Sequence, residues 1–373
     1  MAAPAMRLLL WTLLVALGAT TSWAAAVGEP SIAAPGGLSP EETPQFILLT
    51  HDDGVDAESR SAMLKLLKGK TAEKGCQLTA TMFTLMDPDG WTACEEVMKV
   101  YKAGLEIADH TISHEKLPGM ERSKLVNEIV GARDKLVDCG VPKEDVVGLR
   151  TPYLDTDTAV REVLHQNGFL YEAALIEDWK WSVSKGFGNR IWPWDLKYGI
   201  PINCSLADLV QDTKQVCGKN ESWPGLWEVP TWRLTNETAG ERPYAMDPGF
   251  VYECGTDGCM NDTSTVFEIL KDNFDRTYAG NRAPFPIFIH IYWLKAEDNT
   301  EQLKEFIDYT LSKPNVYYVT MRQLLAWVQN PVPASQLTPE MLGCGQKGGR
   351  PGTLADGAPK GGSNKQRRRR ALR

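Results

Sequence analysis

The amino-acid sequence predicts an α/β fold, a distorted (β/α)7-8 barrel in which parallel strands are joined by helices. Three observations lead to this prediction. Short apolar segments alternate with longer amphipathic segments, which is the pattern of successive βα units. Glycines such as Gly69, Gly104 and Gly140 stand where amphipathic segments stop, and glycine commonly ends a helix in this way. Polar residues directly follow several apolar segments, as they do at the end of a barrel that carries an active site.

The elements are expected in a regular order along the chain. The apolar segments that predict strands are 46–49, 79–85, 105–108, 146–149, 170–175, 226–229, 286–291 and 316–319. The amphipathic segments that predict helices are 57–68, 91–103, 121–139, 157–167, 264–275, 298–312 and 321–329. Because this number of strands with helical connections is typical of a closed barrel, we prefer a barrel to an open sheet.

Sequence composition divides the chain into regions. We expect a signal peptide at 1–24, a linker at 25–43, a barrel at 44–330 with a long loop insertion at about 180–285, and a Gly-rich basic tail, taken as disordered, at 331–373. The signal peptide is predicted because Arg7 precedes a short apolar stretch that is followed by small residues. That stretch is short for a membrane span, so an uncleaved anchor is the less favoured alternative.

Charge and cysteine content indicate the class of protein. The net charge is −8 at pH 7, and this acidic balance argues against nucleic acid as the main partner. Residues 345–373 hold nine Lys or Arg and one Asp. This basic segment is either a solvated tail or a contact with an anionic wall or surface. Eight cysteines in a secreted chain allow up to four disulfides.

Glycosylation sequons agree with passage through a secretory pathway. They begin at Asn203, Asn220, Asn236 and Asn261. Their clustering predicts that this part of the chain is largely surface loop. We therefore expect a secreted protein, either extracellular or in the cell wall. We also expect it to be a monomer.

Two adjacent carboxylates and two histidines provide a candidate metal site. Asp52 and Asp53 follow the first expected strand, and His110 and His114 follow the third. The carboxyl ends of barrel strands converge on one face, so these side chains are expected to meet there. Asp53 and the two imidazoles suit Zn²⁺ with one position left for water, although Co²⁺ or Ni²⁺ would accept the same ligands. Asp52 is then free to act as a base, while a chance histidine pair is the alternative.

Further polar residues follow other expected strands. Arg150 is a candidate partner for Asp52, although an ordinary surface salt bridge is the alternative. Asp178 also lies beyond a strand end. His290 ends an apolar strand, where it is either a catalytic acid or a buried structural residue. Tryptophans crowd 179–232, where they could stack on sugar rings or pack the insertion.

Five segments, in order, resemble the motifs of the NodB-like polysaccharide deacetylases, carbohydrate esterase family 4, and especially the secreted chitin deacetylases of eukaryotes. The segments are Thr50-His51-Asp52-Asp53-Gly54, His110-Thr111-Ile112-Ser113-His114, Arg150-Thr151-Pro152-Tyr153, Asp178-Trp179 and Ile287-Phe288-Ile289-His290. The resemblance covers about 44–330 and implies a barrel of the NodB-homology type. Two positions depart from the family pattern, because His51 replaces an aromatic residue and Ile287 replaces a leucine.

The resemblance implies that Asp53, His110 and His114 are the metal ligands and that Asp52 is the general base. It also implies roles for other residues. The backbone N–H of Tyr153 would join the metal in stabilising an oxyanion, and Arg150 would position the base. His290 would protonate the leaving amine, with Asp178 orienting its ring. His51 is expected to point into the core or toward a neighbouring strand, because side chains alternate along a strand.

The expected function is that of a secreted, metal-dependent hydrolase. It would remove N-acetyl groups from a polymer of N-acetylglucosamine, in the first place chitin, and release acetate. The glycan is thus the expected partner. One alternative is a non-catalytic matrix protein that binds chitin through the same groove. A second keeps the chemistry and changes the substrate to peptidoglycan or to acetylated xylan.

Overall fold

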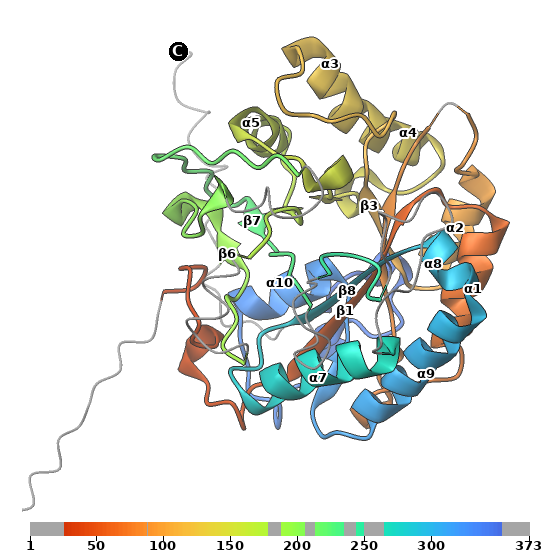
Figure 1. The fold of residues 1–373 in the computed structure, drawn as a ribbon, viewed down its shortest axis with the longest axis vertical. Coiled ribbons are helices and arrows are strands. Elements are labelled where there is room, and N and C mark those ends of the chain that lie inside the picture. The colour runs from red at the N-terminus through yellow and green to blue at the C-terminus, as the bar shows by residue number, and fades with distance from the viewer. Residues whose placement is uncertain are drawn as a thin grey trace, which may run out of the picture.

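A curled mixed sheet forms the centre of the molecule, and helices pack around it (Figure 1). The computed structural model describes residues 26–87, 89–177, 188–205, 213–234, 244–249 and 265–352. The expected α/β fold class is confirmed, and among the described strands the sheet is a curled half-barrel whose two end strands do not pair, not a closed barrel. None of the helices in these ranges is long and apolar enough to cross a membrane.

The strands follow the expected order, with one addition. They are β1 Gln45–Asp53, β2 Thr81–Thr84, β3 Glu106–Asp109, β4 Gly148–Leu149, β5 Tyr171–Glu172, β6 Trp194–Asp195, β7 Trp227–Glu228, β8 Phe285–His290 and β9 Val316–Tyr318. The sheet order is β6-β7-β5-β4-β3-β2-β1-β8, and β9 pairs with the start of β1. All named pairs are parallel except β6 with β7, which is antiparallel. The sequence does not reveal β6, because it is only two residues long.

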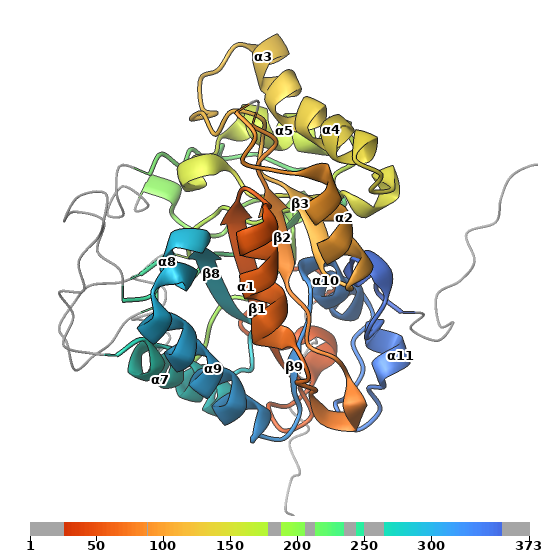
Figure 2. The same cartoon turned by 90° about the vertical axis from the view of Figure 1, so that its right-hand side faces the viewer.

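The helices cover the sheet much as the amphipathic segments predict. They are α1 Ala57–Leu67, α2 Cys94–Lys102, α3 Arg122–Val126, α4 Ala132–Asp138, α5 Thr158–Gln166, α7 Val266–Ala279, α8 Ile291–Lys295, α9 Glu297–Leu311, α10 Met321–Gln329 and α11 Pro339–Leu342. The expected helix over 121–139 is α3 and α4 joined by a π-helical turn. In Figure 2, α1 and α2 lie in front of the first three strands. The insertion expected at about 180–285 also supplies β6, β7 and α7.

Strand β1 lies inside the sheet, between β2 and β8, and it is buried along almost its whole length. It carries the apolar residues Phe46 to Leu49 in its first half and pairs with β2 on one side and β8 on the other. Buried parallel strands are apolar on both faces, which explains the continuous apolar run. Directly beyond it, Asp56 begins α1 by accepting hydrogen bonds from the N–H groups of Glu58 and Ser59. Strand β1 therefore delivers its final residues to a fixed position.

The register of the strands brings the functional motifs to one edge of the sheet. Asp52 lies opposite His290 of β8, and Asp53 lies opposite Thr84 of β2. Thr84 in turn lies opposite Asp109, the residue before His110. Because these strands are parallel, their carboxyl ends lie at the same level, so residues that are distant in sequence converge there.

The expected linker packs against the barrel in the part that is described. The N–H of Trp192 donates to the carbonyl of Ser31, and the side chain of Asn281 donates to the carbonyl of Ile32. The linker is therefore held by the insertion and by the segment before β8. Residues 1–25 lie outside the described residues, so the signal peptide stays a prediction.

The predicted start of the disordered tail, residue 331, is too early in the chain. Residues 331–352 contain α11 and are joined to the barrel by a disulfide between Cys344 and Cys76. Arg350 forms an ion pair with Asp145, 2.6 Å between Nη2 and Oδ2, and Arg322 bonds to the other oxygen of the same carboxylate. The Gly-rich composition conceals this packing, because the partners of Arg350 lie far away in sequence. Residues 353–373 lie outside the described part of the chain.

Six cysteines are joined in three disulfides in the described residues. The pairs are Cys76–Cys344, Cys94–Cys139 and Cys204–Cys217. This agrees with the expectation of a disulfide-containing protein. Cys254 and Cys259, which would complete a fourth pair, lie outside those residues.

Most of the described tryptophans of the insertion favour packing, one of the two alternatives left open by the sequence. The side chains of Trp192, Trp194, Trp227 and Trp232 are buried, so they pack the protein interior. These four are therefore not available for sugar stacking, whereas Trp223 is only partly buried. Trp179 and Trp181 lie outside the described residues.

Candidate metal centre and active site

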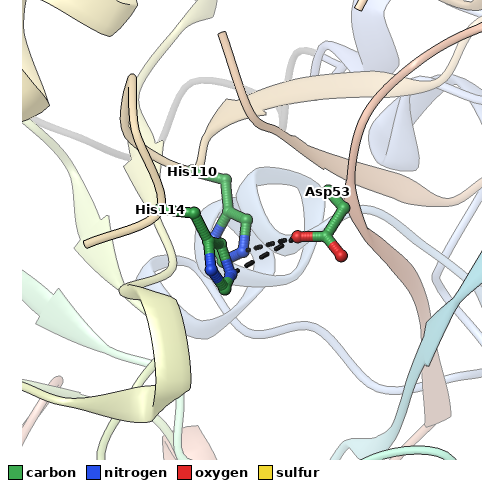
Figure 3. A group of neighbouring side chains, drawn as sticks. All are labelled: Asp53, His110 and His114. Carbon is green, nitrogen blue, oxygen red and sulfur yellow. Dashed lines mark ion pairs between the residues drawn. The ribbon is translucent and has the colours of Figure 1, made fainter. Parts of the chain in front are cut away.

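Three side chains from two strand ends converge at the carboxyl edge of the sheet. Asp53 ends β1, whereas His110 and His114 follow β3. Oδ1 of Asp53 lies 3.5 Å from Nε2 of His110 and 3.4 Å from Nε2 of His114. Figure 3 shows the carboxylate facing both imidazole rings. The three potential ligand atoms lie within 4.8 Å of one another, so one ion can contact all of them.

The hydrogen bonds of this group fit a divalent cation. Nδ1 of His110 lies 2.7 Å from the carbonyl oxygen of Arg150. A carbonyl only accepts, so Nδ1 carries the proton and Nε2 presents its lone pair toward Asp53. Within the described residues, buried Nε2 of His110 and Oδ1 of Asp53 have no hydrogen-bond partner. Unpaired buried polar atoms are costly, and a cation bound between them would satisfy both.

The protonation states also suit a metal site. Burial lowers the pKa of His114 to about 4, and the neighbouring His110 ring contributes in the same direction, so His114 is neutral at pH 7. Burial would raise the pKa of Asp53, but the His110 ring and the neighbouring imidazoles hold it well below its usual range. The group thus offers a carboxylate and a neutral imidazole without first losing a proton, as metal binding requires.

Asp52 contacts a different partner from Asp53. Its Oδ2 lies 2.7 Å from Nε of Arg150, and both side chains are almost fully buried. The guanidinium is itself fixed, because Nη1 donates to the carbonyl of Ala173 and the group lies 3.7 Å from the ring centroid of Phe288. Oδ1 of Asp52 has no hydrogen-bond partner among the described residues. The ion pair therefore holds one oxygen of Asp52 and leaves the other as an available proton acceptor.

His290 lies on the other side of Asp53, with 3.9 Å between Nε2 and Oδ2. Its Nδ1 is 2.6 Å from Oδ2 of Asp247, and its backbone N–H donates to Oδ1 of the same carboxylate. The hydroxyl of Tyr292 also donates to this carboxylate at 2.9 Å. Burial alone would lower the pKa of His290, but the charge and the hydrogen bond of Asp247 raise it to about 9. His290 is therefore protonated at neutral pH and is suited to donate a proton.

The backbone at the site adopts conformations that L residues rarely take. Positive φ angles occur at Asp53 (84°), His114 (55°), Tyr153 (59°) and Asp247 (47°). Each such residue costs about 1–3 kcal/mol and persists only where the surrounding structure imposes the conformation. Strain of this kind gathers at functional sites, because the surrounding packing holds side chains in positions that a relaxed backbone would not give.

Comparison with known proteins identifies the family of this site. Residues 39–171, which contain the carboxylate pair, both histidines and Arg150, match the family model described as polysaccharide deacetylase. The chain contains a polysaccharide deacetylase domain. This is the NodB-type domain of carbohydrate esterase family 4.

Two curated relatives of this chain come from Bombyx mori. The chain is similar to chitin deacetylase 8, with 27% identity over 313 residues, covering 80% of this chain and 74% of the relative. It is also similar to chitin deacetylase 1, with 27% identity over 318 residues, covering 81% of this chain and 54% of the relative. The chain thus spans about half the length of the second relative.

A solved structure supports the fold of this chain. A protein from Mycobacterium smegmatis that is assigned to the polysaccharide deacetylases superposes with a TM-score of 0.53 and 20% identity. The similarity covers 82% of this chain and 96% of that protein. At this identity the likeness concerns the fold alone.

The structure brings most of the expected site residues together. Asp52, Asp53, His110, His114, Arg150 and His290 lie at one edge of the sheet, at the distances given above. Tyr153 adjoins them, because its ring centroid is 4.8 Å from that of His114. Asp178 lies outside the described residues, so its expected role stays a prediction.

Asp247 is the site residue that sequence reasoning missed. It holds Nδ1 of His290, the position expected for Asp178. Its only local signal is the sequence Asp247-Pro248-Gly249, which is typical of a turn and not of a site. Because the contact joins residues 43 apart, no spacing rule reveals it.

His51 is buried, as the alternation along β1 predicts. Its register neighbours are Met82 of β2 and Ile289 of β8. Burial lowers its pKa to about 4, so the ring is neutral. Within the described residues neither ring nitrogen has a hydrogen-bond partner, and nothing in the structure explains why a histidine stands here instead of an aromatic residue.

Proposed function

We propose that this protein is a secreted, metal-dependent chitin deacetylase that hydrolyses N-acetyl groups and releases acetate. The observation that supports the proposal is that three kinds of functional group lie together at one edge of the sheet. A candidate metal triad, a carboxylate with one free oxygen and a protonated histidine lie together at the edge of the sheet. A protein that only binds chitin has no need of the carboxylate and the histidine beside the triad.

The residues of the triad would hold Zn²⁺, with Co²⁺ as an alternative. When bound, such an ion supplies Lewis-acid chemistry, which polarises a carbonyl and makes a water molecule more acidic. Asp53, His110 and His114 provide the ligands that this ion prefers.

The other residues handle protons and charge. Oδ1 of Asp52 accepts a proton from the attacking water, while Arg150 keeps the carboxylate in place. As the new C–O bond forms, the backbone N–H of Tyr153 donates to the carbonyl oxygen that becomes negative. When the C–N bond breaks, His290 gives its Nε2 proton to the leaving amine. Asp247 stabilises the charged imidazole before this step and keeps Nε2 directed toward the site.

Three observations support a secreted glycoprotein with a glycan substrate. The described residues hold three disulfides, which persist in oxidising compartments. The sequon residues Asn203 and Asn220 are exposed. The two Bombyx mori relatives are named chitin deacetylases.

Acetate release from chitin oligomers tests the proposal. Purified protein is assayed as isolated, after treatment with a strong chelator, and after Zn²⁺ or Co²⁺ is restored. We expect activity that disappears with the chelator and returns with the metal. Parallel assays on peptidoglycan and acetylated xylan decide between chitin and these two polymers. Tight chitin binding without acetate release by the metal-loaded protein would contradict the proposal.

A further inference from the structure

Two buried glutamates lie next to the arginine that holds the proposed base. Glu172 ends β5 and Glu228 ends β7, and the two residues are direct partners in the parallel register of these strands. Both side chains are fully buried, and the charge of Glu228 acts on Arg150. Paired positions of neighbouring strands present their side chains on the same face of a sheet, so the two carboxyl groups face one another. Neither glutamate has a part in the proposed reaction.

The contacts of Glu172 favour its charged form. Thr156 donates a hydrogen bond to Oε1 of Glu172, and Nη1 of Arg161 lies 3.7 Å from its Oε2. Burial raises the pKa of Glu172, whereas these two contacts lower it. The carboxylates of Glu221 and Asp157 add weakly to the rise. Arg161 also pairs with Glu221, with 2.7 Å between Nε and Oε2, so two carboxylates already share its charge.

Glu228 is the member of the pair that keeps a proton. Burial and the charge of Glu172 raise the pKa of Glu228 well above its usual range, and Arg161 and two backbone N–H groups oppose this only in part. Among the described residues, Oε2 of Glu228 and Oε2 of Glu172 have no hydrogen-bond partner. A proton on Oε2 of Glu228 leaves one negative charge in the pair instead of two, and it offers a donor to the unpartnered oxygen of Glu172.

The other oxygen of Glu228 fixes the backbone that follows β5. Oε1 accepts hydrogen bonds from the N–H groups of Ala174 and Leu175, which are 3.2 and 2.9 Å long. The carbonyl of the preceding residue, Ala173, accepts from Nη1 of Arg150 at 2.8 Å. The carboxyl group of Glu228 therefore holds the short segment from which the guanidinium is bonded.

The segment that follows β7 contacts the same arginine. Nη1 of Arg150 also donates to Oγ1 of Thr231 at 3.3 Å. The N–H of Thr231 donates to the carbonyl of Leu175, so the segments after β5 and β7 are joined to each other. Nε of Arg150 then contacts Oδ2 of Asp52. A continuous set of contacts thus leads from Glu228 to the proposed base.

We propose that Glu228 is a positioning residue, which holds the segment after β5 so that Arg150 orients the base Asp52. This inference rests on the proposed function and deepens it. A neutral carboxyl suits the task, because an ionised Glu228 would attract the guanidinium of Arg150 in competition with Asp52. The proton on Glu228 therefore leaves the charge of Arg150 to Asp52.

Glu106 provides a matched control for Glu228. It is also fully buried, burial also raises its pKa, and it also accepts a hydrogen bond from a backbone N–H, that of Arg322. Its carboxyl accepts further hydrogen bonds from the hydroxyl groups of Thr81 and Tyr171. Glu106 begins β3, however, at the opposite edge of the sheet from the metal triad. Its replacement disturbs a similar buried carboxyl far from the contacts of Arg150.

Steady-state acetate release from chitin oligomers tests the role of Glu228. Glu228→Met keeps the length of the side chain but removes the oxygen that holds the two N–H groups, so we expect kcat to fall about 10- to 100-fold with little change in KM. Glu228→Gln imitates the neutral carboxyl and should keep kcat within about threefold of the wild type. Glu106→Met should keep the wild-type kcat and KM. Unchanged kcat in Glu228→Met, or an equal loss in Glu106→Met, would overturn the inference.

Thermal melting tests the neutral state of Glu228 without any turnover. Because its pKa is raised in the folded protein, Glu228 lowers stability as the pH rises from its unfolded value near 4.3 toward its folded value. Glu228→Gln removes this loss, so its melting temperature should rise relative to the wild type between pH 5 and pH 8. A relative fall over this range would show that the charged form is needed and would overturn the inference. Folded wild-type protein that releases no acetate from any oligomer would instead contradict the proposed function.

Discussion

The contact between Asp247 and His290 gives the sharpest prediction, for the substitution Asp247→Asn. This change keeps the size of the side chain and an oxygen that can accept from the backbone N–H of His290, but it removes the negative charge beside Nδ1. Burial opposes the protonated ring, and the charge and the hydrogen bond of Asp247 are the largest of the effects that raise the pKa of His290 to about 9, with smaller contributions from Asp53 and Asp52. Without the charge of Asp247, burial should bring the pKa of His290 to its ordinary value near 6.5 or below.

The size of the effect follows from the protonated fraction of His290. At pH 8 that fraction is roughly 90% with a pKa of about 9, and roughly 3% with a pKa of about 6.5. If only protonated His290 serves the leaving amine, kcat at pH 8 falls by roughly 30-fold in Asp247→Asn. With a variant pKa of about 6.5, the two proteins differ much less at pH 6, because both then carry mainly protonated His290.

The assay is the pH profile of acetate release from chitin oligomers. Wild-type kcat should decline as the pH rises through about 9, whereas the decline for Asp247→Asn should occur near or below 6.5. Asp178→Asn is the companion variant, and equal metal content in all three proteins is the control. If Asp247→Asn keeps the wild-type profile, or if Asp178→Asn shows the large shift instead, the role given to Asp247 is wrong.

Four further outcomes are expected. Asp52→Asn should keep its metal content but lose about 10²–10⁴ in acetate release, and retained turnover would point to another base. Arg150→Met leaves buried Asp52 unpaired, so denaturant unfolding should show a loss of about 3–5 kcal/mol, and unchanged stability would argue against the buried ion pair. Replacing Cys76 and Cys344 by serine should lower the free energy of unfolding by about 2–5 kcal/mol, and an unchanged melting temperature would show that the tail contributes nothing. The raised pKa of His290 adds stability that is fully present below pH 6.5 and lost as the pH rises through about 9, so the pH dependence of melting should be weaker in Asp247→Asn.

The positions of those site residues that lie in short contiguous motifs could be predicted from the sequence. The carboxylate pair and the histidine pair each directly follow a short strand-like segment, so their place at the edge of the sheet could be predicted. The same holds for Arg150 and His290, which lie at or next to strands adjoining those two. In each case strand alternation and parallel pairing determine where the side chain goes.

Other features depend on contacts that no local pattern encodes. Asp247 reaches His290 from a turn, and Arg350 reaches Asp145 across 205 residues from a Gly-rich segment that looks disordered in sequence. Strand β6 is too short to show periodicity. The burial of most insertion tryptophans also depends on tertiary packing. The sequence does not show whether a tryptophan side chain lies in the core or contacts a ligand.

The central claim is that Asp53, His110 and His114 bind one divalent cation that the hydrolysis requires. The most direct measurement is elemental analysis of purified wild-type protein and of His110→Ala, paired with acetate release from chitin oligomers. We predict about one equivalent of metal per wild-type chain, none in the variant, and activity only where metal is bound. Wild-type activity in protein stripped of metal, or equal metal content in the two proteins, would contradict the account.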